Sequence, residues 1–245
     1  MKFGAYLQEN LFPPWRLSYF GYDRLKQELK IRQLDHEWTE KDEEEFIQLF
    51  DSELIKVKDF IHAKLAEIDA RILYCERSVQ NGDSYNAVDE ALTDILFDVN
   101  DLSRFTRLNY VATQKMLKKH DRWTGRKLRQ TYLENLRPLD NQRFDVPLVY
   151  ISALQDLCRN QGKPSKAQKS DKGNSAEKTT YWIHPDNITE VKSILMLHLP
   201  VLHAAKTFQP SDAAVSSIYL DNSNFDLYTG LLQKDEMAET IQLDW

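Results

Sequence analysis

Glycine and cysteine are scarce in this chain of 245 residues, which holds 7 glycines and 2 cysteines. Because every glycine stands alone, no glycine-rich loop can cradle a nucleotide phosphate. Cys75 and Cys158 lie far apart in the sequence, and neither belongs to a Cys/His group with zinc-ligand spacing. These absences argue against a nucleotide-binding loop, a disulfide framework and a zinc site. We expect two reduced cysteines in a cytosolic setting, with Cys75 on a core face.

Long apolar runs are also missing. Crossing a bilayer takes about 18 or more apolar residues. The best candidate, Ile194–Leu202, is short and is interrupted by His198 and Pro200. The N-terminus has no apolar core of signal-peptide length, and Lys2 stands where a myristoylation signal needs glycine. We therefore expect no transmembrane segment in this chain.

What the sequence does contain is helical periodicity. Apolar residues recur every three or four positions from Phe46 to Val79, and again from Tyr85 to about Gly125. Thr39 and Asp42 have the spacing of a capping box before the first stretch, and the Asn81–Asp83 turn ends it. This pattern predicts two long antiparallel helices with a narrow apolar stripe between them.

Shorter helices are expected around this pair. Met1–Asn10 and Tyr19–Gln33 form a predicted N-terminal helical hairpin, interrupted by Pro13-Pro14. Leu128–Leu136 and Pro147–Arg159 are two further predicted helices. The expected fold class is therefore mainly α, with a helical hairpin and a long-helix bundle.

The composition changes after this helical part. Gly162–Glu177 is polar, small and dotted with lysine, as is typical of a flexible linker. Beyond it we predict one helix over Pro185–Leu202 and strands over Ser216–Asn222 and Thr240–Trp245, with Leu227–Gln233 as a possible third strand. The expected parts are a helical domain, a flexible linker and an incomplete α+β piece, at 1–161, 162–178 and 179–245.

Positive charge is concentrated in one segment. The chain has a net charge of −6, yet nine Lys and Arg residues lie between Arg104 and Arg129 against one acid, Asp121. The i, i+3, i+4 and i+7 spacing puts four cations on one helix face: Lys115, Lys118, Lys119 and Arg122. Like charges one turn apart cost about 0.2–0.5 kcal/mol per pair, and a compact polyanion would remove most of that cost.

Two other interpretations of this face remain open. It could be a solvated surface, because a helix C-terminus favours cations. It could also be a basic scaffold surface for an acidic partner or for nucleic acid. Apart from Trp123, no aromatic residue suited to base stacking is interleaved with the lysines, so we expect no nucleic acid.

Three motifs at fixed distances carry a family resemblance. They are MKFGAYL, PPWRLSYFGYDRLK and RLNYVATQKMLKKHDRWTG, and over roughly Met1–Gln161 they resemble the SPX domain. After the linker, YWIHPDNITEVKSILMLHLPVL and SSIYLDNSNFDLYTGLLQKDE look like the start of a tunnel-shaped polyphosphate polymerase domain. The chain thus resembles an N-terminal portion of a subunit of the fungal vacuolar transporter chaperone complex.

The SPX resemblance implies a sensor of phosphate status that binds inositol polyphosphates or pyrophosphates as regulatory ligands, without a required cofactor. It also implies other subunits of that complex as partners, at the cytosolic face of the vacuolar membrane. Tyr22, Lys26 and Lys119 match the family's phosphate-binding cluster, and the other cations of the helix face match its second lysine-rich surface. With Lys2 at the start of the first helix, the implied ligand-binding residues are Lys2, Tyr22, Lys26, Lys115, Lys118, Lys119 and Arg122.

The sequence also departs from these patterns. Ala112 and Thr113 stand where SPX relatives usually have glycine and an aromatic residue. The polymerase subunits place basic residues at four positions that are not basic here: Leu231, Gln233, Gln242 and Asp244. We therefore expect no catalytic residues on this chain alone. The alternative is the front part of a polyphosphate polymerase subunit that uses ATP.

Overall fold

The computed structural model describes residues 3–140, 144–163, 179–184, 187–199, 217–233 and 238–244. The chain divides into two compact units, Met1–Val201 and Leu202–Trp245.

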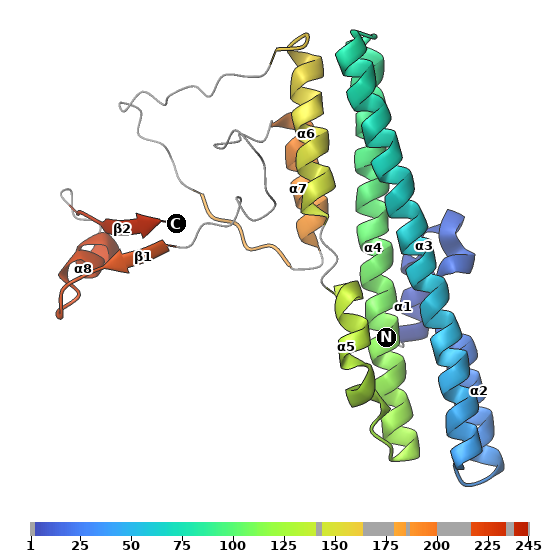
Figure 1. Cartoon of the computed structure of the whole chain (residues 1–245). Helices are drawn as coiled ribbons and strands as arrows, with labels where there is room; N and C mark the ends of the chain where they lie inside the picture. Colours follow the sequence, from blue (N-terminus) through green and yellow to red (C-terminus); the bar gives the residue numbers. More distant parts are fainter. Residues whose placement is uncertain are drawn as a thin grey trace. The chain divides into compact units, whose positions relative to one another are not determined.

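The described part of the first unit is helical, as predicted. In chain order its elements are α1 (Phe3–Asn10), the 3-10 helix η1 (Pro13–Ser18), α2 (Tyr22–Asp35), α3 (Glu40–Asn81), α4 (Tyr85–Thr124), α5 (Leu128–Asp140), α6 (Asp145–Arg159) and α7 (Ile188–His198). Figure 1 shows α3 and α4 running side by side along most of their length. Helix α4 contacts α2, α3, α5, α6 and α7, which makes it the central helix of the bundle.

Local signals set the ends of the two long helices. The Thr39 hydroxyl accepts the Asp42 N–H at 3.2 Å, and the Asp42 carboxylate accepts the Thr39 N–H at 2.9 Å, so the predicted capping box is present. Helix α3 ends at Gly82 and α4 at Gly125, each with a φ of 75°. Glycine adopts this left-handed conformation without the steric cost that other residues meet.

The apolar stripes of α3 and α4 form one core. On α3 the stripe buries residues from Phe46 to Cys75, and on α4 from Val88 to Leu117. Phe50, Val57, Leu92 and several others are fully inaccessible. Burying a side chain of this size is worth about 1.5–3 kcal/mol, so this seam is a main source of stability.

The N-terminal hairpin is attached to the long helices by buried polar contacts. Asn109 of α4 is 0% exposed; its amide oxygen accepts the Phe20 N–H at 2.7 Å, and its amide nitrogen donates to the Phe105 carbonyl at 2.7 Å. Glu53 of α3 accepts the Gly21 N–H at 3.0 Å. The start of α2 is therefore held by both long helices.

Helix α7 packs on α4 and α6. Ser193 is buried, Met196 and Leu197 pack against the core, and Lys192 forms an ion pair with Asp145 at the start of α6. Residues 164–178 of the expected linker lie outside the described residues, so the proposed boundaries of the linker stay a prediction.

The second unit contains a small antiparallel sheet. Strand β1 (Ser217–Leu220) pairs with β2 (Ile241–Asp244), with Leu220 opposite Ile241. The expected strands at these two places are confirmed. Two strands do not form a tunnel, so the described residues leave the tunnel-shaped domain a prediction.

The expectation of a strand over Leu227–Gln233 is wrong, because this segment is helix α8 (Asp226–Gln233). The Asp221 carboxylate accepts the Leu227 and Tyr228 N–H groups at 3.2 and 2.8 Å, which caps the first turn of the helix. Apolar side chains four positions apart, such as Leu227 and Leu231, then lie on one helix face.

Substitution Asn109→Ala should destabilise the protein by about 1–3 kcal/mol, because the buried Phe20 N–H loses its acceptor. The loss is measured by urea denaturation monitored by circular dichroism. Asn86→Ala, at an exposed position of the same helix, is the matched control and should change the free energy of unfolding by less than about 0.5 kcal/mol. Equal effects of the two substitutions would contradict the proposed role of Asn109.

Candidate ligand-binding site

Most of the predicted site residues lie on two helices. Tyr22 and Lys26 are on α2, and the four cations of the basic face are on the C-terminal part of α4. Lys115, Lys118 and Arg122 are exposed, whereas Lys119 and Lys26 are half-buried. Lys2 lies outside the described residues.

Lys26 and Lys119 come from distant parts of the sequence but lie close enough to influence each other. Burial lowers the pKa of the Lys119 ammonium, and the positive charges of Lys26 and Arg122 lower it further. Like charges raise the cost of protonating a neighbouring amine. The fold therefore places the positive charges of Lys26 and Arg122 near that of Lys119.

Tyr22 lies at the start of α2, beside α1. Its side chain is 6% exposed, and its ring meets the Phe3 ring edge-on with 5.0 Å between centroids. Burial raises the pKa of its hydroxyl, and the charge of Asp23 raises it further. Among the described residues, none forms a hydrogen bond with this hydroxyl. Tyr22 therefore packs in the core and also keeps a neutral donor for another group.

Helices α1 and α2 approach each other closely at this point. A Cβ added to Gly4 would lie 2.7 Å from the Asp23 Oδ1 atom, so a larger residue here would require the Asp23 side chain to move. The Gln8 amide donates to the Asp23 carboxylate at 3.4 Å. This contact links α1 to α2 beside Tyr22.

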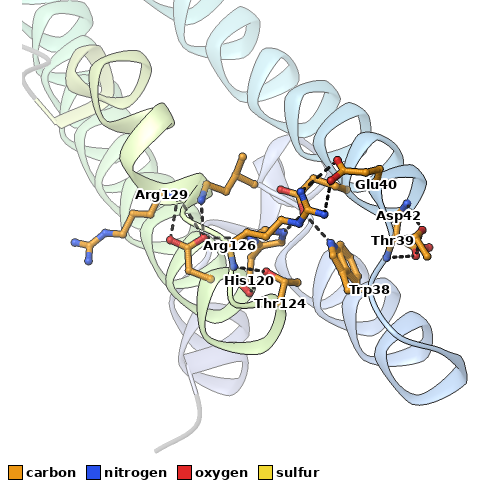
Figure 2. Close-up of polar contacts among 11 residues, drawn as sticks. Trp38, Thr39, Glu40, Asp42, His120, Thr124, Arg126 and Arg129 are labelled. Atoms are coloured by element: carbon orange, nitrogen blue, oxygen red, sulfur yellow. Dashed lines mark hydrogen bonds and ion pairs between the residues drawn. The ribbon is translucent and has the colours of Figure 1, made fainter.

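A buried polar network lies beneath the basic face, and Figure 2 shows it. His120 is 0% exposed; its Nε2 atom lies 3.0 Å from Glu43 Oε2, and its Nδ1 atom lies 3.2 Å from Asp121 Oδ1. Glu43 also accepts the Trp38 indole N–H at 2.7 Å. The Phe46 ring stacks on the imidazole with 4.7 Å between centroids. The network joins the end of α4 to the beginning of α3.

Arg126 extends this network to the surface. Its guanidinium donates to both Glu40 oxygens, at 2.9 and 3.2 Å, and its Nε atom lies 3.7 Å from Glu43. Arg126 therefore helps to join the end of α4 to the beginning of α3, although it is one of the nine basic residues counted in the sequence.

Asp121, the one acid of the basic segment, also has a structural partner. Its carboxylate accepts the Leu128 N–H at 2.9 Å and the Arg129 N–H at 3.2 Å, which caps the start of α5. Because this carboxylate is engaged by α5 and His120, it is not available to pair with the exposed lysines.

A separate cavity of about 300 Å³ lies along α1, α4 and the start of α7. It is lined by Tyr6, Asn10, Arg104, Arg107, Leu108, Val111, Asn187 and Glu190. None of the described residues predicted to bind ligand is in this lining, which holds an acid, Glu190, as well as the two arginines. This cavity is therefore not the predicted polyanion site.

The described residues lack two other kinds of feature, a candidate metal site and a candidate membrane span. No group of three or more His, Cys, Asp or Glu side chains in this part of the chain is arranged to hold a metal ion. Within the same residues, no helix combines the length and apolar character needed to cross a bilayer.

Comparison with known proteins covers both parts of the chain. The family model described as VTC domain matches residues 175–245. Across its full length the chain is 39% identical to vacuolar transporter chaperone complex subunit 4 and 31% identical to subunit 2, both of Schizosaccharomyces pombe. It spans only 37% and 38% of the length of these two relatives.

The helical part is similar to SPX domains. SPX domain-containing protein 1 of Arabidopsis thaliana is 28% identical, over 56% of this chain and 61% of that protein. The solved SPX domain of Chaetomium thermophilum glycerophosphodiester phosphodiesterase 1, in complex with inositol hexakisphosphate, matches with a TM-score of 0.53 and 23% identity. The match covers 66% of this chain and 100% of that structure.

The helical part of the chain has the fold of an SPX domain and is similar in sequence to SPX domain proteins. As predicted, the chain also resembles the N-terminal portion of a vacuolar transporter chaperone subunit.

The sequence patterns did not predict the buried pair of His120 and Glu43 beneath the basic face. His120 continues the spacing of Met116 and Leu117, which are both buried, and this pattern could have placed its ring in the core. Nothing in the sequence indicates Glu43 as its partner, because Glu43 lies in an acidic first turn that resembles a solvated helix start.

Substitution Glu43→Gln should destabilise the SPX domain by about 1–3 kcal/mol, because His120, Trp38 and Arg126 lose a shared charged acceptor. Glu44→Gln, at the exposed neighbouring position, removes the same charge outside the network and is the control. Urea denaturation of both variants measures the difference. An equal free energy of unfolding for the two would show that Glu43 contributes only its charge.

Proposed function

We propose that the SPX domain of this protein binds an inositol polyphosphate or pyrophosphate through the basic cluster of α2 and α4. The observation that carries the proposal is that Lys26 lies near Lys119, whose pKa is lowered by burial and then by the charges of Lys26 and Arg122. A polyanion between them would turn this repulsion into attraction. The proposed ligand-binding residues are Lys2, Tyr22, Lys26, Lys115, Lys118, Lys119 and Arg122.

The chemistry of the side chains suits such a ligand. Each phosphate carries up to about two negative charges and three strong acceptor oxygens. Each lysine ammonium offers three donors on a flexible stem, so several lysines can approach phosphates that point in different directions. Tyr22 adds a neutral donor from α2. The SPX structure that matches this fold was solved with inositol hexakisphosphate, which supports this choice of ligand class.

The biological role that we propose is the sensing of phosphate status for a polyphosphate-synthesising complex at the vacuolar membrane. Two similarities support it. One is the match to the VTC domain over 175–245, and the other is the sequence identity of 39% and 31% with subunits 4 and 2 of the S. pombe complex. The inositol phosphate would act as a regulatory ligand. Other subunits of the complex would be the partners and would hold the chain at the cytosolic face of the membrane.

A second candidate function is supported by the same VTC match. The chain would then be the front part of a polyphosphate polymerase subunit, with residues 179–245 as the beginning of the tunnel-shaped domain. Transfer of labelled phosphate from ATP to polyphosphate by the purified chain would support this function. We expect no transfer, because Leu231, Gln233 and Gln242 replace basic residues of the polymerase subunits.

Substitutions Lys26→Ala and Lys119→Ala should each weaken the binding of inositol hexakisphosphate about tenfold, because a charge-assisted contact is lost. Isothermal titration calorimetry at 50 mM and at 150 mM salt measures the affinity. The wild-type affinity should fall at the higher salt concentration, because ions screen the attraction. Lys41→Ala, an exposed lysine at the start of α3, is the matched control. A wild-type protein that binds no inositol hexakisphosphate at 50 mM salt would refute the proposed function.

The lowered pKa of Lys119 leads to a pH dependence. The free protein releases this proton at a lower pH than an ordinary lysine, and a bound polyanion raises the pKa again. Binding should therefore take up protons, and affinity should fall as the pH rises through the pKa of free Lys119. Titrations between pH 8 and 10, in buffers of different ionisation enthalpy, measure both effects.

Substitution Lys119→Arg provides the control for this prediction. Arginine stays protonated throughout this range, so the fall in affinity and the proton uptake should both become smaller. An unchanged pH profile in this variant would show that another group titrates.

A further inference from the structure

Trp123 is placed beside the basic cluster by the last turn of α4. Its ring is half-buried and packs against the core, so its position is set by the bundle. The Lys119 Nζ atom lies 4.7 Å from the centroid of this ring. Residues four positions apart on a helix are neighbours, so the two side chains meet within one turn.

A second contact joins Trp123 to α2. Its backbone carbonyl accepts a hydrogen bond from the Gln33 side-chain amide at 3.0 Å. Trp123 therefore touches Lys119 through its ring and touches the helix that carries Lys26 through its backbone. In the part of the chain that the structure describes, the other two cation–π pairs are Lys64 with Trp15 and Arg107 with Tyr110. Neither pair includes a residue of the basic cluster.

We propose that Trp123 is a positioning residue that holds the Lys119 ammonium in the cluster when no ligand is bound; this rests on the function proposed above. Lys119 is half-buried beside two cations, and repulsion favours turning its side chain away into solvent. The negative face of the indole ring attracts the ammonium and offsets that repulsion. Because the side chain is already ordered, less conformational entropy is lost when a phosphate arrives.

The geometry of an ammonium group allows both contacts together. It carries three N–H donors, and one aromatic face engages only one side of it. The remaining donors can bind phosphate oxygens without breaking the contact with the ring. Trp123 thus prepares Lys119 for the ligand and has no need to touch the ligand itself.

Aromatic and aliphatic substitutions separate this role from simple packing. Trp123→Leu keeps an apolar side chain without a π face, and Trp123→Phe keeps a π face with a weaker attraction for cations. We expect the affinity for inositol hexakisphosphate to fall about five- to tenfold in the leucine variant and by a smaller factor in the phenylalanine variant. Calorimetry on the full chain measures these affinities, in the wild type and in a Lys119→Ala background.

In the Lys119→Ala background, Trp123→Leu should cause no further loss, because the ring has no ammonium to hold. Nuclear magnetic resonance gives a second measurement: the ring current should shift the Lys119 side-chain protons in the free protein, and Trp123→Phe should reduce the shift. This measurement does not depend on whether the leucine variant folds.

Three results would overturn the inference. One is an equal loss of affinity in the leucine and phenylalanine variants, and another is a loss that persists without Lys119. The third is the absence of a ring-current shift on Lys119. An affinity that is unchanged by Lys119→Ala alone would instead reject the proposed ligand site, and the positioning role with it.

Discussion

The apolar seam between α3 and α4 is the constraint on which the rest of this molecule depends. Each long helix has one narrow stripe of apolar residues, and burying both stripes against each other fixes the rotation of both helices. At the C-terminal end of α4 this rotation turns Met116, Leu117 and His120 inward. Lys118 then lies exposed and Lys119 half-buried, so the basic face follows from how the core is packed.

The end of the seam is polar, and this determines how the basic face is presented. His120 and Glu43 meet in the interior, while Asp121 is engaged by the first turn of α5. Glu43 and Asp121 therefore both have structural partners inside the bundle. In the part of the chain that the structure describes, the exposed Lys115, Lys118 and Arg122 form no ion pair with a carboxylate, which leaves a local excess of positive charge.

Helix α4 also links the two sequence regions that show different similarities. It carries the basic face in the SPX part and contacts α7, whose residues fall within the VTC domain match. Near the start of α7, Asn187 and Glu190 share a cavity with Arg104 and Arg107 of α4. Helix α4 therefore carries part of the proposed ligand site and also contacts α7, a helix within the VTC match.

Local sequence patterns determined much of the helical fold. The three- and four-residue spacing, the Thr39 capping box and the glycines that end α3 and α4 act within one or two turns, so they can be recognised without the tertiary structure. The same limit explains the error over α8. A short apolar segment suits a strand or a helix equally, and the cap provided by Asp221 decided it.

The basic face of α4 was likewise evident from spacing alone, and the family motifs implied Tyr22 and Lys26 as its companions. The closeness of Lys26 to Lys119, the His120–Glu43 pair and the placement of Trp123 were decided only by the tertiary structure. The physical reason is that these contacts join different helices, or depend on which face of a helix is buried. Helical periodicity determines which residues share a face, but long-range packing determines which faces meet.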